Sequence, residues 1–251
     1  MVTLCGVIGL FSVKDSRSGV KEKSNYFQDL IYGFRPSVVK ENSKLYLSLT
    51  AACMFNIAVQ IFLPYLFIYL QHYLGFDFAT LQITPLVIVG ALAALVGFIA
   101  VTVLLGKLID RVGKVNFIYP SVVIFIVGLV AVYFAKKLWV FGLLALIMLV
   151  GYGLLMIVLN ASVRDFTPED KVGQFQGVRM IFYVLLPMVI GPAIGNKTIE
   201  LFAKNYDLGT MLNDYGEATL VPIPTIFLAA AAVAVLIIIP LIFLQRQNKK
   251  Q

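Results

Sequence analysis

The residues best suited to bind a solute in this 251-residue chain are neutral and polar, because its long apolar stretches hold no Asp, Glu, Lys or Arg at depth. Asn56 and Gln60 are four residues apart and therefore share one face of a helix. Their amides donate and accept hydrogen bonds, as recognition of a sugar hydroxyl requires, although a hydrogen bond between helices is the alternative role. Tyr152 lies between two glycines, and Asn160 could line a gate or cap a helix end. These four residues are the predicted cavity lining.

Patterns typical of catalysis or metal binding do not occur in the sequence. It contains no H-E-x-x-H, no nucleophile elbow, no phosphate-binding glycine loop and no histidine or carboxylate pair within the apolar stretches. Cys5 and Cys53 lie in apolar stretches and give neither a disulfide framework nor metal-ligand spacing. His72, the single histidine, lies near an apolar boundary and is predicted to be solvated. We therefore predict no enzyme, no metal site and no cofactor.

Composition defines the elements that must position the polar residues. Hydrophobic residues make up 60% of the chain and charged residues 13%, whereas soluble domains average about 45–50% and about 25%. So few charges could not cover a soluble fold of this size, which predicts an all-α polytopic membrane protein with a bundle of six transmembrane helices. The fifth span is interrupted at its far end by Lys197 and Glu200. The predicted spans are Leu47–Leu70, Leu81–Gly106, Asn116–Ala135, Leu138–Asn160, Met180–Phe202 and Ile223–Leu244.

The distribution of Lys and Arg predicts the orientation of these spans. Sixteen of the 20 basic residues fall before the first span, in the second and fourth connections, and after the last span. Only Lys136, Lys137, Lys197 and Lys204 fall in the other connections. The basic side is cytoplasmic in membrane proteins, so both ends are predicted to be cytoplasmic, in the plasma membrane. The net charge of +7 thus indicates orientation and contact with membrane lipid rather than a nucleic-acid partner.

The segment before the first span divides in two. Met1–Val13 is apolar but too short to cross a bilayer, and we predict that it is the cytoplasmic end of a preceding helix. Residues 14–45 form a charged linker, in which apolar residues at helical spacing, ended by Arg35-Pro36, predict an amphipathic helix on the inner leaflet. Packing against a soluble partner is the alternative for this helix. Residues 46–245 then form the transmembrane domain, and 246–251 a cytoplasmic tail.

A patterned loop, GKLIDRVGK at residues 106–114, follows the second predicted span. Gly106 permits close approach of neighbouring helices, and Gly113 permits a tight turn at positive φ. Asp110 can face the positive end of the next helix, while Arg111 and Lys114 hold the loop at the inner face. The pattern predicts a loop whose geometry is coupled to the position of two helices.

This G-x-L-x-D-R-x-G-K pattern resembles the signature loop of the major facilitator superfamily. The next inner loop, RDFTPEDKVGQFQGVRM at residues 164–180, resembles the equivalent loop of its sugar–cation (glycoside-pentoside-hexuronide) symporter-like branch. Tyr32–Asn42 and Gln60–Tyr65 resemble the linker and seventh span of that branch. The candidate gating residues are therefore Gly106, Asp110, Arg111, Gly113 and Lys114 in the first loop, and Arg164, Asp165, Pro168, Gly177 and Arg179 in the second.

The resemblance implies the C-terminal six-helix half of a twelve-span secondary active transporter, a first half being the alternative. Such a protein moves a small polar solute, such as a sugar or glycoside, by alternating access. It implies that a coupling cation, H⁺ or Na⁺, is bound by the half absent from this chain, and that this chain needs an N-terminal six-helix half or a second copy. A non-transporting membrane protein, such as a truncated-gene remnant or an assembly or regulatory subunit, is the alternative function.

Overall fold

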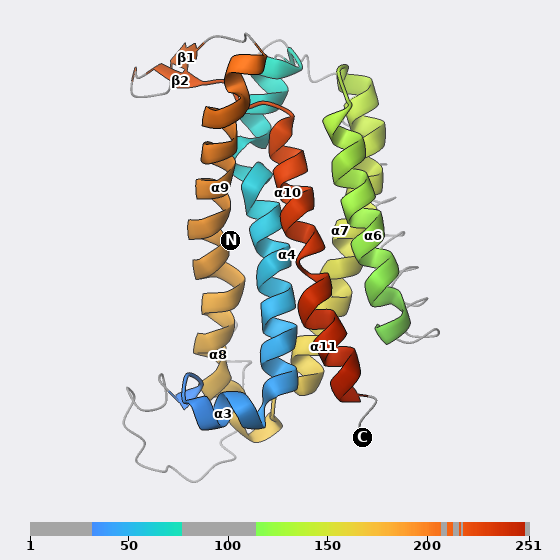
Figure 1. The fold of residues 1–251 in the computed structure, drawn as a ribbon, viewed down its shortest axis with the longest axis vertical. Coiled ribbons are helices and arrows are strands. Elements are labelled where there is room, and N and C mark those ends of the chain that lie inside the picture. Colours follow the sequence, from blue (N-terminus) through green and yellow to red (C-terminus); the bar gives the residue numbers. More distant parts are fainter. Residues whose placement is uncertain (1–31, 77–113, 207–209, 213–215, 217, 249–251) are drawn as a thin grey trace, which may run out of the picture.

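The computed structural model describes residues 32–76, 114–206, 210–212, 216 and 218–248. Long helices run side by side along one axis of the molecule (Figure 1). The first part contains α3 (Pro36–Glu41), α4 (Ser43–Ile68) and the π-helical segment η1 (Tyr69–Tyr73). It is followed by α6 (Lys114–Tyr133), α7 (Leu138–Phe166), η2 (Glu169–Lys171), α8 (Val172–Met180), η3 (Ile181–Leu185), α9 (Leu186–Phe202), η4 (Ala203–Asn205), β1 (Thr210–Leu212), β2 (Ala218–Leu220), α10 (Thr225–Val235) and α11 (Ile238–Asn248).

The helices confirm the all-α membrane fold class. Four continuous helical runs are long and apolar enough to cross a bilayer: Ser43–Tyr73, Leu138–Phe166, Glu169–Asn205 and Thr225–Gln247. A shorter apolar helix, Phe117–Tyr133, corresponds to the third predicted span. The second predicted span, Leu81–Gly106, lies outside the described residues. A run of 31 residues such as Ser43–Tyr73 is about 46 Å long, so it extends beyond a bilayer core of about 30 Å.

Helix α4 lies at the centre of the described bundle, in contact with α7, α9, α10 and α11. Its buried residues, among them Phe55, Ile61 and Phe62, form the main core. Gly191 of α9 lets that helix approach closely, because a Cβ there would lie 2.4 Å from the Cβ of Gln60. Helices α6 and α7 also approach closely, because a Cβ at Gly128 of α6 would lie 2.5 Å from the Cα of Met148 of α7. Glycines therefore set the spacing of these helix pairs.

Two prolines explain two of the irregular turns in the long helical runs. Pro187 has no N–H to donate to the carbonyl of Tyr183, four residues earlier, and the turn around that carbonyl is the π-helical segment η3. Pro240 likewise leaves the carbonyl of Leu236 without its helical donor, and the chain breaks there between α10 and α11. Each proline thus interrupts the regular α-helical hydrogen bonding of its run.

A β-hairpin, which the sequence analysis did not predict, lies in the connection between α9 and α10 (Figure 1). Strands β1 and β2 pair antiparallel, with Thr210 opposite Leu220 and Met211 opposite Thr219. It lies at the end of the bundle away from the basic connections, which corresponds to the predicted outer side.

The short helix α3 lies across the opposite end of the bundle (Figure 1). Most of the amphipathic helix predicted to end at Arg35-Pro36 lies outside the described residues. A separate helix, α3, begins at Pro36, because proline is well suited to the first position of a helix. Of the four apolar residues that give the predicted segment its helical spacing, Phe27, Leu30 and Ile31 lie outside the described residues, and Phe34 is exposed. Val38 of α3 belongs to a second, smaller hydrophobic core, to which the inner connection between α7 and α9 also contributes side chains.

Candidate functional site

A small, mainly apolar pocket with three polar side chains in its lining lies where α4, α7 and η3 meet. Its volume is about 80 Å³, enough for a few water molecules. We call it the junction pocket. Its lining residues are Ala52, Phe55, Asn56, Met156, Leu159, Asn160 and Tyr183. Two of the four predicted cavity residues, Asn56 and Asn160, therefore line one pocket, although 104 positions separate them in the sequence.

The amide nitrogens of the two asparagines donate hydrogen bonds to backbone carbonyls of their own helices. Asn56 Nδ2 donates to the carbonyl of Ala52 at 2.9 Å, and Asn160 Nδ2 donates to the carbonyl of Met156 at 2.7 Å. These bonds fix the two side chains. The oxygen Asn160 Oδ1 accepts from Arg179 Nη2 at 3.2 Å, which links α7 to α8. The fixed amides thus present their oxygens to the surrounding space.

Arg179 and Tyr183 belong to the same helical run, four residues apart. The Arg179 guanidinium carbon lies 5.1 Å from the centre of the Tyr183 ring, within the range of a cation–π contact. The Tyr183 hydroxyl is buried and makes no hydrogen bond within the described part of the chain. A π-helical turn at Ile181–Leu185 carries Tyr183 to the pocket, and π turns inside α-helices recur at functional sites.

The other two predicted cavity residues do not line the junction pocket. Gln60 lies one turn along α4 from Asn56, where its Cβ and backbone pack against Gly191 of α9. The Tyr152 ring packs on Phe55 with a centroid distance of 5.4 Å. Because Phe55 itself lines the pocket, Tyr152 supports one wall from behind.

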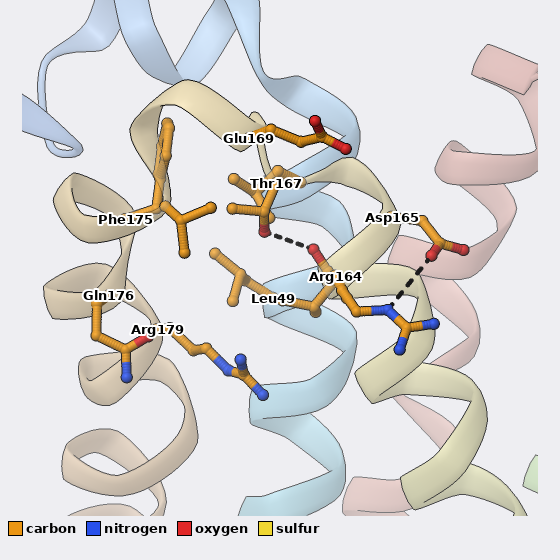
Figure 2. A pocket seen from close by; sticks show the side chains of 11 residues that line it. Leu49, Arg164, Asp165, Thr167, Glu169, Phe175, Gln176 and Arg179 are labelled. Atoms are coloured by element: carbon orange, nitrogen blue, oxygen red, sulfur yellow. Dashed lines mark hydrogen bonds and ion pairs between the residues drawn. The ribbon is translucent and has the colours of Figure 1, made fainter. Parts of the chain in front are cut away.

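A larger cavity of about 500 Å³ opens among the inner ends of α4, α7 and α8 (Figure 2). We call it the inner cavity. Figure 2 shows Arg179 extending from α8 toward α4, while Arg164 and Asp165 project from the end of α7. Arg179 thus lines the inner cavity and also contacts Asn160 and Tyr183 of the junction pocket. Its lining residues are Leu45, Leu49, Val163, Arg164, Asp165, Thr167, Glu169, Val172, Phe175, Gln176 and Arg179.

The loop between α7 and α8 is held by local bonds. The Thr167 hydroxyl donates to the carbonyl of Val163 at 2.6 Å and closes the end of α7. Arg164 and Asp165 form a wide ion pair at 3.8 Å on the exposed side of the loop. Pairs of this kind in water contribute little to stability, so the loop's position depends on its packing.

The predicted gating residues are distributed between the described and undescribed parts of the chain. Pro168 precedes η2 and Gly177 lies within α8. Lys114 is the first residue of α6. Gly106, Asp110, Arg111 and Gly113 lie outside the described residues.

The linker is fastened to this inner loop through Tyr32 and Tyr46. Lys171 Nζ donates to the Tyr32 hydroxyl at 2.9 Å, and the Tyr46 hydroxyl donates to the carbonyl of Gly33. Phe175 makes edge-on contacts with both tyrosine rings, at centroid distances of 6.2 Å and 6.4 Å. The start of α4, the linker and the α7–α8 loop therefore form one packed unit.

The sequence analysis did not assign Tyr183 to the cavity and placed Arg179 among the candidate gating residues. The signal that could have found them is their spacing of four on one helix face, with Pro187 four residues further on. Within the described residues, no cluster of His, Cys, Asp and Glu could hold a metal ion. The arrangement offers hydrogen bonds and one positive charge to a solute.

These features define a polytopic helical membrane protein with a polar site among its helices. The family model described as Major Facilitator Superfamily matches residues 1–192 and 103–251, which together span the chain. The chain therefore belongs to the major facilitator superfamily, whose members are transporters rather than enzymes. No curated protein and no solved structure matches it.

Proposed function

We propose that residues 46–245 form one six-helix half of a secondary active transporter, which moves a small polar solute across the membrane by alternating access. The observation that carries the proposal is the junction pocket, where Asn56, Asn160 and Tyr183 from three helical runs meet within a largely apolar bundle. Polar side chains inside a membrane bundle face its interior or a cavity, and they mark solute pathways. Membership of a transporter superfamily supports the same function.

The positions of the two cavities suggest a route for the solute. The inner cavity opens at the end of the bundle where the basic connections lie, and Arg179 stands between it and the junction pocket. The Arg179–Asn160 hydrogen bond joins α8 to α7 across this route. Rocking of one helix bundle against another would separate or close these helix ends, as alternating access requires. The packed linker and α7–α8 loop would then move together.

The side chains of the site favour a solute rich in hydroxyl groups, such as a sugar or glycoside. Amide oxygens accept hydrogen bonds from hydroxyls, and the Tyr183 hydroxyl can donate one. We propose that the coupling cation, H⁺ or Na⁺, is bound by a second six-helix bundle, from an N-terminal half or a second copy of the chain. Exposed apolar side chains on α7 and α9, including Leu143, Leu146, Met188 and Val189, would contact that bundle or membrane lipid.

The charge distribution supports an orientation with both ends in the cytoplasm, and we propose that the membrane is the plasma membrane. The inner loop with Arg164, Lys171 and Arg179 lies at the same end of the bundle as the start of α4 and the end of α11. Basic side chains on that side are retained by the cytoplasmic leaflet and its anionic lipids.

Uptake into proteoliposomes tests this function. Vesicles with the chain as a monomer are expected to take up no radiolabelled sugar, whereas vesicles with the chain and an N-terminal six-helix half are expected to show saturable uptake. Asn56→Ala should then lower uptake, because the pocket loses a fixed acceptor. Asn196→Ala is the matched control, since Asn196 is exposed on α9 and bonds to Glu200. Uptake that never exceeds that of empty vesicles with any N-terminal half would favour a non-transporting membrane protein.

A further inference from the structure

Another cavity lies at the hairpin end of the bundle, where the ends of α6, α9 and α10 meet. Its volume is about 620 Å³, within the range of about 300–1,000 Å³ that small-molecule sites occupy. We call it the outer pocket. The described residues that line it line neither the junction pocket nor the inner cavity, so the proposed solute route does not account for it.

The part of the outer pocket nearest the hairpin end is polar. Tyr133 ends α6, Asn205 and Tyr206 follow α9, and Thr225 begins α10. The side chains of Tyr133 and Tyr206 are hydrogen-bonded to each other. The Thr225 hydroxyl is buried and makes no hydrogen bond within the described part of the chain. A buried hydroxyl without a partner is costly, so a ligand that bonds to it is stabilised there.

The deeper part of the outer pocket offers apolar contact. Leu228 and Ala229 lie about one turn of α10 further from the hairpin end than Thr225. Thr198 lines the pocket from α9, but its hydroxyl already donates to the carbonyl of Ile194 at 2.8 Å. The described lining therefore changes from polar to apolar along the direction in which the helices enter the membrane.

An exposed apolar surface continues this deeper part along α10. Ala232, Val235 and Leu236 are exposed and follow Leu228 and Ala229 at helical spacing. No side chain from residue 226 to residue 244 is polar. In a membrane such a surface contacts lipid acyl chains. A small water-soluble ligand would leave this surface uncovered, whereas a molecule with a polar head and an apolar chain would contact the whole of it.

Basic side chains at the same end complement a phosphate group. Lys136 and Lys137 follow α6, Lys204 directly precedes Asn205, and all three lysines are exposed. A phosphate diester accepts hydrogen bonds, and the hydroxyls and the amide of the polar part can donate them. Polar and basic pockets between membrane helices bind lipid headgroups in this way.

We propose that the outer pocket binds one glycerophospholipid from the leaflet at the hairpin end. Its phosphate and ester oxygens bond to the polar part, chiefly to Thr225 and Asn205, and one acyl chain lies over Leu228, Ala229 and the exposed face of α10. Since α10 contacts both α6 and α9, this lipid connects the ends of three helices. The proposal goes beyond the transport function and does not depend on it.

Native mass spectrometry of the purified 251-residue chain in detergent tests the site with matched ligands. The probes are dioleoylphosphatidylglycerol, dioleoylglycerol, which has the same chains without the phosphate, and glycerol 3-phosphate, which has no chains. We expect one dioleoylphosphatidylglycerol molecule to bind saturably, and the other two ligands to bind about tenfold or more weakly, because each contacts only one part of the pocket. Equal binding of dioleoylglycerol would overturn the phosphate contact. Equal binding of glycerol 3-phosphate would assign the pocket to a soluble phosphate ligand and overturn the lipid site.

Variants locate the bound lipid. Ala229→Phe fills the apolar part and should weaken phospholipid binding about tenfold or more. Ala193→Phe is the matched control, because Ala193 is exposed on α9 and does not line the pocket. Thr225→Val should weaken binding about fivefold through the lost hydrogen bond. Thr50→Val, which removes a hydroxyl bonded within α4, should leave binding unchanged. Equal affinities for Ala229→Phe and Ala193→Phe would overturn the site.

Photocrosslinking of the wild-type chain keeps the test decisive if Ala229→Phe does not fold. The chain is reconstituted in phosphatidylcholine vesicles that contain a trace of phosphatidylglycerol with a diazirine near the ester end of one acyl chain. We expect the peptide with Leu228 and Ala229 to be labelled several-fold more than the peptide with Leu143 and Leu146, which are exposed on α7 outside the pocket. Equal labelling of the two peptides would show a general lipid contact and overturn the proposal.

Discussion

Replacement of Gly191 by alanine should force α9 away from α4. The new Cβ would lie 2.4 Å from the Cβ of Gln60 and 2.9 Å from its carbonyl carbon, and neither atom can rotate away. Carbon atoms pack at about 3.5 Å or more, so the helices must separate locally by about 1 Å. Such overpacking costs about 1–3 kcal/mol.

The helix propensity of alanine acts in the opposite direction, by about 1 kcal/mol relative to glycine. Gly153→Ala on α7 is therefore the matched control, because a Cβ at Gly153 meets nothing within 4 Å. Both variants gain the same propensity, and only Gly191→Ala encounters a neighbouring helix. The difference between their free energies of unfolding then isolates the steric cost, which we expect to be about 1–3 kcal/mol.

Unfolding by sodium dodecyl sulfate in mixed micelles, followed by circular dichroism, measures this difference. Combining Gly195→Ala with Gly191→Ala should increase the loss of stability. Gly195 is on the same face of α9, and a Cβ there would lie 2.4 Å from the carbonyl oxygen of Ile61. If Gly191→Ala and Gly153→Ala unfold within about 0.5 kcal/mol of each other, the close contact between α4 and α9 is wrong.

Three other predictions test separate contacts. Tyr65→Phe removes the 2.9 Å hydrogen bond from the Tyr65 hydroxyl to the carbonyl of Pro192 in α9. It should lower the free energy of unfolding by about 0.6 kcal/mol in the same assay. A loss above about 2 kcal/mol would show that packing, not this bond, has changed. Tyr46→Phe removes the bond to Gly33 and should accelerate amide hydrogen exchange across α3, whereas unchanged exchange would show that the linker is held by other contacts. Trp139, the single tryptophan, is 86% exposed at the start of α7. Its fluorescence should be quenched more by lipids brominated near the headgroup than by iodide in water, and the reverse order would place this helix end outside the membrane interface.

The sequence predicted where helices occur better than where they end. Windows free of charged residues located the described spans, but α4 begins at Ser43 rather than Leu47, and the helical run containing Arg179 begins well before Met180. The charges mark where a span leaves the hydrocarbon core. The backbone hydrogen bonds of a helix continue beyond that point, so the helix does not end there.

The candidate site was predictable in part, for a geometric reason. Spacing on one helix identifies a shared face, and it indicated Asn56 together with Gln60. It does not show which neighbour covers each turn of that face: Gly191 packs against Gln60, while Asn56 opens onto the junction pocket. The contact of Arg179 with Asn160 depends on how α8 packs against α7, which no pattern within one helix contains.

Water and solute access to position 56 tests the central claim most directly. Asn56→Cys in a chain with Cys5 and Cys53 replaced by alanine would be labelled with a hydrophilic maleimide in reconstituted vesicles. The control is a second chain in which Cys5 is replaced by alanine and Asn56 and Cys53 are kept, since Cys53 is only 4% exposed on the same helix. A cavity on the solute route predicts that Asn56→Cys is labelled much faster than Cys53 and that the transported solute slows this labelling. Labelling as slow as that of Cys53, or unaffected by any transported solute, would contradict the account.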